Sequence, residues 1–304
     1  MSGVAYAVAQ EPQVSQHDLL MSCADSWVAG WTLELAGFDV SALTDAYAAH
    51  IHAENTDPSS PPPSAWPTGY QKLASTTMFT LFWAGDEFAP MLKIPLSQHA
   101  QTPFAFPRQH VAEEEEVGIG TFLQNSLIAS FAKLAKRLAD CPALIGLEPM
   151  NEPHPGFLEM PSFHAWSPTT DLAYCWTPSA LQSLALGSGF PQKVSYYDHA
   201  FPVTKVTRTE VLRPNRSAWR TECIWKQHGV WQWDEAKQEA IVTRNSYFQY
   251  HPGTQQKIDF YQYWFSFVKR FGQRMCHINP DWLIFAGAVP NEVSQAFSLL
   301  ECLY

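Results

Sequence analysis

One pattern occurs twice in this chain of 304 residues and restricts the folds that the chain can adopt. In each copy, apolar residues at helical spacing precede a short turn, an apolar run of strand length and the dipeptide Asn-Glu. The first copy has its apolar run at Ala143–Leu147 and its dipeptide at Asn151-Glu152. The second copy has them at Trp282–Ala288 and Asn291-Glu292. Because a helix that leads into a buried strand is the repeating unit of a parallel sheet, the pattern predicts parallel α/β units.

Three stretches in all repeat apolar residues at helical spacing. The first runs from Tyr70 until Gly85, the second begins near Ile119, and the third spans Phe260–Phe271. Asn279-Pro280 is expected to stop the third helix, because proline cannot continue a helical hydrogen-bond pattern.

Two acidic stretches lie next to these predicted helices. Glu113–Glu116 precedes the second helix, where negative charge is favourable near the N-terminus. Asp86 and Glu87 follow the first helix and are interpreted as solvated carboxylates of a turn. A structural role explains both stretches, so neither is assigned a metal.

The composition excludes several classes of protein. A net charge of −10 and a pI near 5.5 leave no basic face for nucleic acid. The six cysteines are scattered and are interpreted as reduced thiols of a cytosolic protein. Met1–Gln13 lacks the features of a secretory signal, and no apolar stretch reaches the roughly 18 residues of a transmembrane segment. The sequence therefore predicts a cytoplasmic globular protein.

The tripeptide Asn151-Glu152-Pro153 follows the first predicted strand directly. In (β/α) barrels the side chains that act on substrate lie at the carboxyl ends of strands, so this position favours a catalytic carboxylate. Pro153 and Pro155 cannot continue a strand ladder and direct the chain away from the sheet. A strand-end turn capped by its own side chains is the structural alternative.

The longer motif Pro149–Gly156 resembles the acid/base signature of glycoside hydrolase family five. It looks like the version of this signature found in endoglycoceramidase-like enzymes and in fungal β-glucosidases that act on glycolipids such as ergosteryl glucoside and glucosylceramide. The resemblance extends from about residue 17 to about residue 295. Further matching segments are Gly30–Glu34, Ala74–Phe82, Leu184–Gly187, His228–Trp231 and Val289–Glu292.

The resemblance implies an α/β fold that is part of a (β/α)8 TIM barrel. It implies roughly the third to fifth strands, with long inserted loops, in residues 17–304, whereas residues 1–16 are a poorly defined start. It also implies a retaining β-glucosidase that hydrolyses a steryl β-glucoside or glucosylceramide. Such a substrate would bring the protein into transient contact with membrane lipid, and the oligomeric state stays open.

The resemblance also implies roles for individual residues. Glu152 is the expected general acid/base, and Asn151 is expected to donate a hydrogen bond to the sugar 2-hydroxyl. Partial burial behind the prolyl turn is expected to keep Glu152 protonated. His17 is a candidate sugar contact, although its Gln-His-Asp order differs from the His-Gln-Asp of the family, and Glu292 is a candidate at the second strand end. No metal or other cofactor is expected, because the histidines show no metal-ligand spacing.

Phe157–Gln249 is a long aromatic segment with little regular pattern, which predicts a loop that shapes a binding site. Its rings, taken singly, favour packing; together they predict a wall suited to a glucoside with a hydrophobic aglycone. The residues concerned are His164, Trp166, Tyr174, Trp176, Trp219, Trp225, Trp231 and Trp233.

A retaining glycosidase needs a second carboxyl group roughly 5 to 5.5 Å from the first. In the family this nucleophile ends the seventh strand, after a His-x-Tyr on the sixth, and the chain contains no His-x-Tyr. We therefore expect a fragment of a larger hydrolase, inactive alone, with the nucleophile beyond Tyr304. Two alternatives stay open: a noncatalytic remnant that binds a glycan or glycolipid, and a degenerate product without a stable fold.

Overall fold

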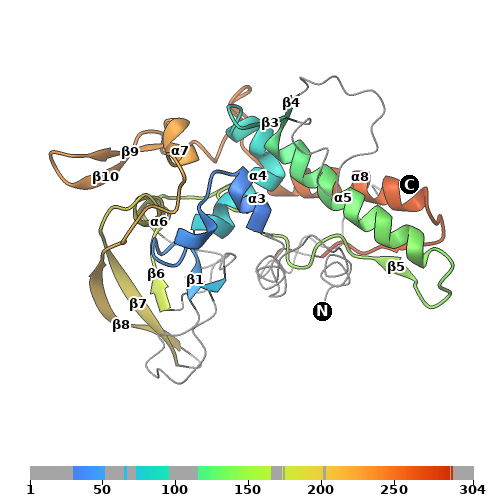
Figure 1. Cartoon of the computed structure of the whole chain (residues 1–304), viewed down its shortest axis with the longest axis horizontal. Helices are drawn as coiled ribbons and strands as arrows, with labels where there is room; N and C mark the ends of the chain where they lie inside the picture. The colour runs from blue at the N-terminus through green and yellow to red at the C-terminus, as the bar shows by residue number, and fades with distance from the viewer. Residues whose placement is uncertain are drawn as a thin grey trace. The chain divides into compact units, whose positions relative to one another are not determined.

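The computed structural model of this chain contains two compact units, each described by itself below. Unit 1 comprises Met1–Ser15, Leu81–Pro155 and Asp259–Tyr304, and unit 2 comprises Gln16–Thr80 and Gly156–Ile258. Figure 1 labels most of their helices and strands. The predicted loose start at residues 1–16 lies outside the described residues. The structure describes residues 30–51, 65–66, 73–95, 116–165, 173, 175–200, 203–287 and 289.

Two long helices of unit 1 lie side by side, α5 (Ile119–Leu138) and α8 (Phe260–Cys276) (Figure 1). The rings of Phe131 and Phe271 meet edge to face between them, 5.0 Å apart. Both predicted helices are confirmed, because each buries one apolar stripe, as an amphipathic helix does.

Helix α4 (Leu73–Phe88) confirms the first predicted helix, which was expected from Tyr70 to Gly85, and its residues from Leu81 onward belong to unit 1. The predicted end at Gly85 is wrong. Instead of ending, the helix is interrupted at Ala84, which has φ −136° and ψ 22°, and then continues to Phe88.

The interpretation of Asp86 and Glu87 as turn carboxylates is wrong, because both lie in α4 and bind other helices. Asp86 accepts hydrogen bonds from the backbone N–H groups of Gly120 (2.8 Å) and Thr121 (3.2 Å) at the start of α5. Glu87 accepts one from the Tyr263 hydroxyl of α8 at 2.7 Å. The first turn of α5 contains no acid, and Asp86 places a negative charge at this helix start. Of the acidic stretch Glu113–Glu116, only Glu116 lies within the described residues.

Two strands of unit 1 form the predicted parallel pair, β5 (Gly146–Leu147) and β11 (Leu283–Ile284). The Leu283 N–H donates to the Ile145 carbonyl at 3.0 Å, and the Phe285 N–H donates to the Leu147 carbonyl at 2.9 Å. Both strands are shorter than predicted; before β5 the chain turns, with the Leu144 N–H bonded to the Cys141 carbonyl. In the antiparallel pair β3 (Lys93–Pro95) and β4 (Glu116–Gly118), Glu116 is exposed.

The two faces of the β5–β11 pair differ in exposure. A methyl group on Gly272 of α8 would lie 3.4 Å from Cγ1 of Ile284, so Ile284 faces this helix. Alternate strand residues point to opposite faces. Leu283 and Phe285 therefore lie on the other face, where they are 57% and 43% exposed. The described residues contain no closed barrel.

Unit 2 contains an antiparallel sheet with the order β6-β7-β8 (Figure 1). The strands are Cys175–Thr177, Gln192–Ala200 and Val203–Leu212, and α6 (Ala180–Gly187) connects the first to the second. A hairpin pairs β9 (Trp231–Asp234) with β10 (Glu239–Val242). The prediction of one long loop over Phe157–Gln249 is therefore wrong. Most of β8 is exposed, so this strand lacks the apolar alternation that would have identified it. The remaining elements of unit 2 are α3 (Gly30–Leu35), η1 (Val40–Ala42), β1 (His50–Ile51), β2 (Ala65–Trp66) and α7 (Ile224–Gln227).

The tryptophans predicted to form a wall mostly lie in the core of unit 2. Trp219, Trp225 and Trp231 are buried, and the Trp225 indole N–H donates to the Thr77 hydroxyl at 2.9 Å. Packing therefore explains these rings. His164 is exposed, Trp176 and Trp233 are half-buried, and Trp166 and Tyr174 lie outside the described residues.

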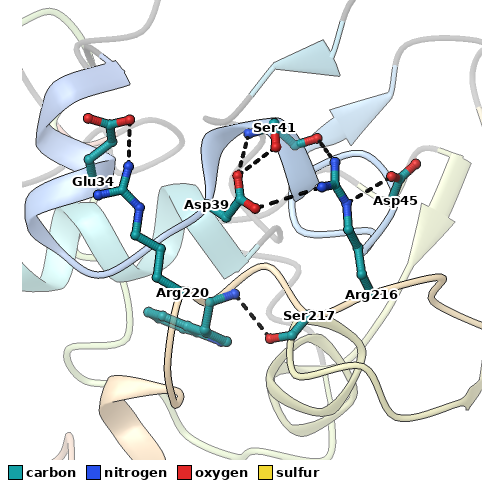
Figure 2. Close-up of polar contacts among 8 residues, drawn as sticks. Glu34, Asp39, Ser41, Asp45, Arg216, Ser217 and Arg220 are labelled. Atoms are coloured by element: carbon teal, nitrogen blue, oxygen red, sulfur yellow. Dashed lines mark hydrogen bonds and ion pairs between the residues drawn. The ribbon is translucent and has the colours of Figure 1, made fainter.

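Two arginines of unit 2, Arg216 and Arg220, connect residues 213–220 to residues 34–45, a stretch that includes the end of α3 and all of η1 (Figure 2). Arg216 is 3.0 Å from an Asp45 carboxylate oxygen and 3.7 Å from one of Asp39, and it also donates to the Ser41 carbonyl. Arg220 is 2.7 Å from a Glu34 carboxylate oxygen. Hydrogen bonds from Ser41, opposed by desolvation and aided by both arginines, hold the pKa of Asp39 below its ordinary value.

Candidate active site

Asn151 and Glu152 lie just beyond the carboxyl end of β5, and both are exposed. Glu152 has a φ of +48°, in the left-handed region that side chains other than glycine rarely adopt. Backbone strain of this kind concentrates at functional sites. The predicted acid/base residue is therefore held at a strand end, in an unusual backbone conformation.

The three residues after Glu152, Pro153-His154-Pro155, are buried. The carbonyl of His154 accepts a hydrogen bond from the indole N–H of Trp83 in α4 at 2.8 Å. Trp83 is 4% exposed. The loop thus presents Glu152 outward while the following backbone is fixed in the interior of unit 1.

The end of β11 lies against the same loop through Gly287. A methyl group on Gly287 would lie 3.0 Å from a Glu148 carboxylate oxygen, 3.4 Å from the Met150 carbonyl and 3.7 Å from the Glu152 nitrogen. The absence of a side chain allows this approach. The structure therefore brings Asn151 and Glu152 together with the end of β11, whereas His17 and Glu292 lie outside the described residues.

In unit 2, the chain that follows the motif is fixed by Gly156 and Phe157. Gly156 has a φ of +68°, and a methyl group there would lie 2.5 Å from the Thr80 hydroxyl. That hydroxyl accepts a hydrogen bond from the Phe157 N–H at 2.8 Å. The Phe157 ring stacks on Phe248, with centroids 5.1 Å apart. Glycine is therefore required at the end of the motif for both conformation and space.

The expected partial burial of Glu152 is not observed, because its side chain is exposed.

Elsewhere, burial and the hydrogen bond to Glu87 raise the pKa of Tyr263 far above its ordinary value. Burial raises the pKa of the Cys223 thiol to about 11, so this thiol is unreactive near neutral pH. Among the described cysteines, Cys141, Cys175, Cys223 and Cys276 are free thiols.

The part of the chain that the structure describes has neither a candidate metal site nor a candidate membrane-spanning helix. It contains no group of three or more His, Cys, Asp or Glu side chains that could hold a metal ion. None of its helices combines the length and apolarity needed to cross a membrane.

Sequence reasoning missed Trp83 and Gly287 at this site. Trp83 lies within an apolar helical pattern, which indicates only that it is buried. Gly287 lies within an apolar strand pattern, where glycine can indicate a close backbone approach. The position of Gly287 in the sequence is therefore the one signal that could have predicted the close approach of this strand end to the Met150–Glu152 backbone.

Comparison with curated proteins gives relatives over most of the chain. It is 41% identical to a glucosylceramidase of Cryptococcus neoformans var. grubii over 284 residues, covering 89% of this chain and 36% of the relative. It is 36% identical to a glucosylceramidase of Rhizopus delemar, covering 86% and 36%, and 29% identical to an ergosteryl-beta-glucosidase of Saccharomyces cerevisiae, covering 72% and 31%. The chain thus spans about a third of the length of these relatives. No family model matches the chain.

The structure is also similar to crystal structures of Cryptococcus neoformans sterylglucosidase 1. For the complex with hit 1, the TM-score is 0.71 at 24% identity, covering 88% of this chain and 39% of the other. The complex with tris gives a TM-score of 0.69 at the same identity. This chain therefore has a mixed helix and strand fold similar to part of that structure.

Proposed function

We propose, on the premise that this chain is a relative of the fungal glucosylceramidases and steryl β-glucosidases, that it carries the acid/base part of a retaining β-glucosidase. The substrate class would be a glycolipid, either a steryl β-glucoside or glucosylceramide. The observation that carries the proposal is the position of Glu152, exposed at the end of a parallel strand beside Asn151. The sequence relationship itself confirms the predicted resemblance.

We also propose that the mixed helix and strand fold of this chain is part of a (β/α)8 barrel. Three observations support it: β5 and β11 are parallel, a helix precedes each strand, and α8 lies against one face of the pair. Parallel sheets are almost always covered on both faces. The exposed side chains of Leu283 and Phe285 are therefore proposed to face the barrel interior, where further strands would cover them.

In the proposed reaction, Glu152 donates its proton to the glycosidic oxygen while a second carboxylate attacks the anomeric carbon. The deprotonated Glu152 then removes a proton from the water that hydrolyses the glycosyl intermediate. The Asn151 amide would donate a hydrogen bond to the sugar 2-hydroxyl. Because Glu152 is exposed here, residues outside the described part would have to provide the nucleophile and close the site around Glu152.

The direct test is a hybrid protein in which this chain replaces the matching third of the Cryptococcus neoformans glucosylceramidase. The hybrid is expected to hydrolyse glucosylceramide and aryl β-glucosides, whereas the 304-residue chain alone is expected to hydrolyse neither. Glu152→Gln should lower kcat by roughly 10²- to 10⁴-fold for leaving groups that need protonation. The loss should be smaller for an acidic phenol, because such a leaving group departs without a proton.

The control is Asp140→Asn, which alters an exposed carboxylate at the opposite end of β5 and should leave kcat unchanged. Asn151→Ala should lower kcat by roughly 10²-fold, the usual effect of removing one transition-state hydrogen bond. Full activity of the Glu152→Gln hybrid would show that the proposed role is wrong. Glycolipid binding without turnover in an otherwise folded hybrid would favour the noncatalytic alternative.

A further inference from the structure

The kink of α4 at Ala84 lies next to the residue that contacts the candidate acid/base loop. A kink interrupts the helical hydrogen bonds that cross it, and the carbonyl groups released there need other donors. The Gln124 side chain of α5 donates to the Phe82 carbonyl at 2.6 Å and reaches the Trp83 carbonyl at 3.5 Å. The kink is therefore stabilised by a side chain from the neighbouring helix.

Gln124 is itself oriented by α8. The guanidinium group of Arg270 donates to the Gln124 carbonyl oxygen at 2.6 Å, which leaves the amide NH2 group directed at α4. Three helices of unit 1 thus meet at the kink through a continuous chain of hydrogen bonds, from Arg270 to Gln124 to Phe82. We call these contacts the kink brace.

The side chain of Trp83 is held by four neighbouring aromatic rings. It meets the rings of Phe82, Phe260, Trp264 and Phe267 edge to face, at centroid distances of 4.7, 5.4, 5.6 and 5.7 Å. With its backbone held at the kink and its ring held in this cluster, Trp83 has a single direction for its N–H group. That direction is the His154 carbonyl, 2.8 Å away.

Only Pro153 separates His154 from Glu152. The proline ring fixes one of the backbone torsions between them, so an anchored His154 carbonyl restricts the backbone of Glu152 closely. Glu152 adopts a φ of +48°, which a residue of this type keeps only where its surroundings impose it. The hydrogen bond from Trp83 supplies such a restraint.

We infer that Trp83 is a positioning residue for the acid/base carboxylate, held in place by the kink brace. The inference rests on the proposed function of Glu152 and adds to it the residues that set its geometry. Trp83 does not touch substrate in this mechanism; it acts through the backbone of His154.

The chain offers a matched control in Trp264. This tryptophan is fully buried in the same aromatic cluster, and its indole N–H has no hydrogen-bond partner in the described part of the chain. Trp83→Phe and Trp264→Phe therefore remove the same atoms from the same core, but only the first removes a hydrogen bond to the loop. A purely structural role for Trp83 predicts equal effects.

The first experiment measures amide hydrogen exchange by mass spectrometry in the full 304-residue chain. Trp83→Phe should accelerate exchange in the peptide that contains Met150–Gly156 by about fivefold, the effect expected from losing one hydrogen bond. Gln124→Glu, which keeps the size of the side chain but removes its donor, should accelerate it by about threefold. Trp264→Phe should leave this peptide unchanged. Equal acceleration by the two tryptophan variants would overturn the inference.

The second experiment uses the hybrid glucosidase. Trp83→Phe should lower kcat by roughly 10- to 100-fold with KM within about twofold, because a displaced catalytic group costs rate more than binding. The loss should be largest for leaving groups that need a proton. Equal losses for all leaving groups would show that Trp83 does not position the acid. Loss of activity in Trp83→Phe with full activity in Glu152→Gln would instead show that the proposed function is wrong.

Discussion

Glu152 combines an exposed side chain with a left-handed backbone, and this combination has a cost in stability. A residue other than glycine in this region is less stable than in the common regions, although asparagine tolerates it better. Proteins retain such a strained backbone at functional sites, where it orients a side chain that takes part in function. If Glu152 is kept for chemistry, replacing it should not weaken the fold.

We therefore predict that Glu152→Asn leaves the free energy of unfolding of the chain unchanged or raises it by about 0.5 kcal/mol. Urea titration followed by tryptophan fluorescence would measure the change. The matched control is Glu148→Asn, because Glu148 is also exposed and has no positive φ. A loss of more than about 1 kcal/mol in Glu152→Asn alone would show that the carboxylate is a structural group.

At the scale of residues, the sequence predicted which residues lie at the strand end but not which distant residues form the hydrogen bonds that position them. Asn151 and Glu152 were placed correctly because a strand and two prolines determine their position locally. Trp83 bonds a carbonyl 71 residues away, and Asp86 caps a helix 34 residues away. Such partners depend on tertiary packing, which hydrophobic periodicity does not encode.

At the scale of elements, helices α5 and α8 were predictable because each has one apolar stripe that it must bury. The parallel order of β5 and β11 followed from the helix that precedes each strand. The strands of unit 2 were missed because the pairing of β7 with β8 rests on backbone hydrogen bonds, whereas the side chains of β8 are mostly exposed. Backbone pairing leaves little trace in a sequence.

Ion pairs add to the backbone hydrogen bonds and the Phe38–Trp219 ring stack that join residues 34–45 to residues 213–220 of unit 2, so part of the stability of this contact should depend on pH. The pKa of Asp39 is lowered in the folded chain, first by the Ser41 hydroxyl and then by nearby arginines. A carboxyl group with a lowered pKa stabilises the fold above its unfolded pKa, and this stabilisation is lost as the pH falls through the folded pKa. We predict that Asp39→Asn destabilises the chain by no more than about 1 kcal/mol at pH 7, since the group is partly exposed. The difference from the parent chain should diminish as the pH falls below about 4.

Arg216 and Arg213 provide the control for this contact. Arg216→Ala removes the ion pairs with Asp39 and Asp45, whereas Arg213 is exposed and has no ion pair in the described part of the chain. Only the first substitution should destabilise the chain, and the effect should shrink as salt is added. A pH-independent difference between Asp39→Asn and the parent would contradict the electrostatic explanation.

At the scale of the whole molecule, the β5–β11 pair is unusual in having a helix against one face and exposed apolar side chains on the other. The chain spans about a third of the length of its curated relatives, and in the proposed barrel the parts of those relatives that it does not match would cover that face. The proposed barrel makes a specific claim about Leu283: it is a surface residue here and a core residue there. The same substitution should therefore have different effects in the two contexts.

We predict that Leu283→Asn changes the free energy of unfolding of the 304-residue chain by less than about 0.5 kcal/mol, because Leu283 is 57% exposed. In the hybrid glucosidase the same change should cost about 2 kcal/mol or more, because a polar amide would be buried in place of an apolar group. Leu147→Asn is the control: Leu147 is already buried in the chain, so this variant should destabilise both proteins. Denaturant titrations of the four variants would give all the values. Equal, small effects of Leu283→Asn in chain and hybrid would mean that this face stays open, and the barrel assignment would then be wrong.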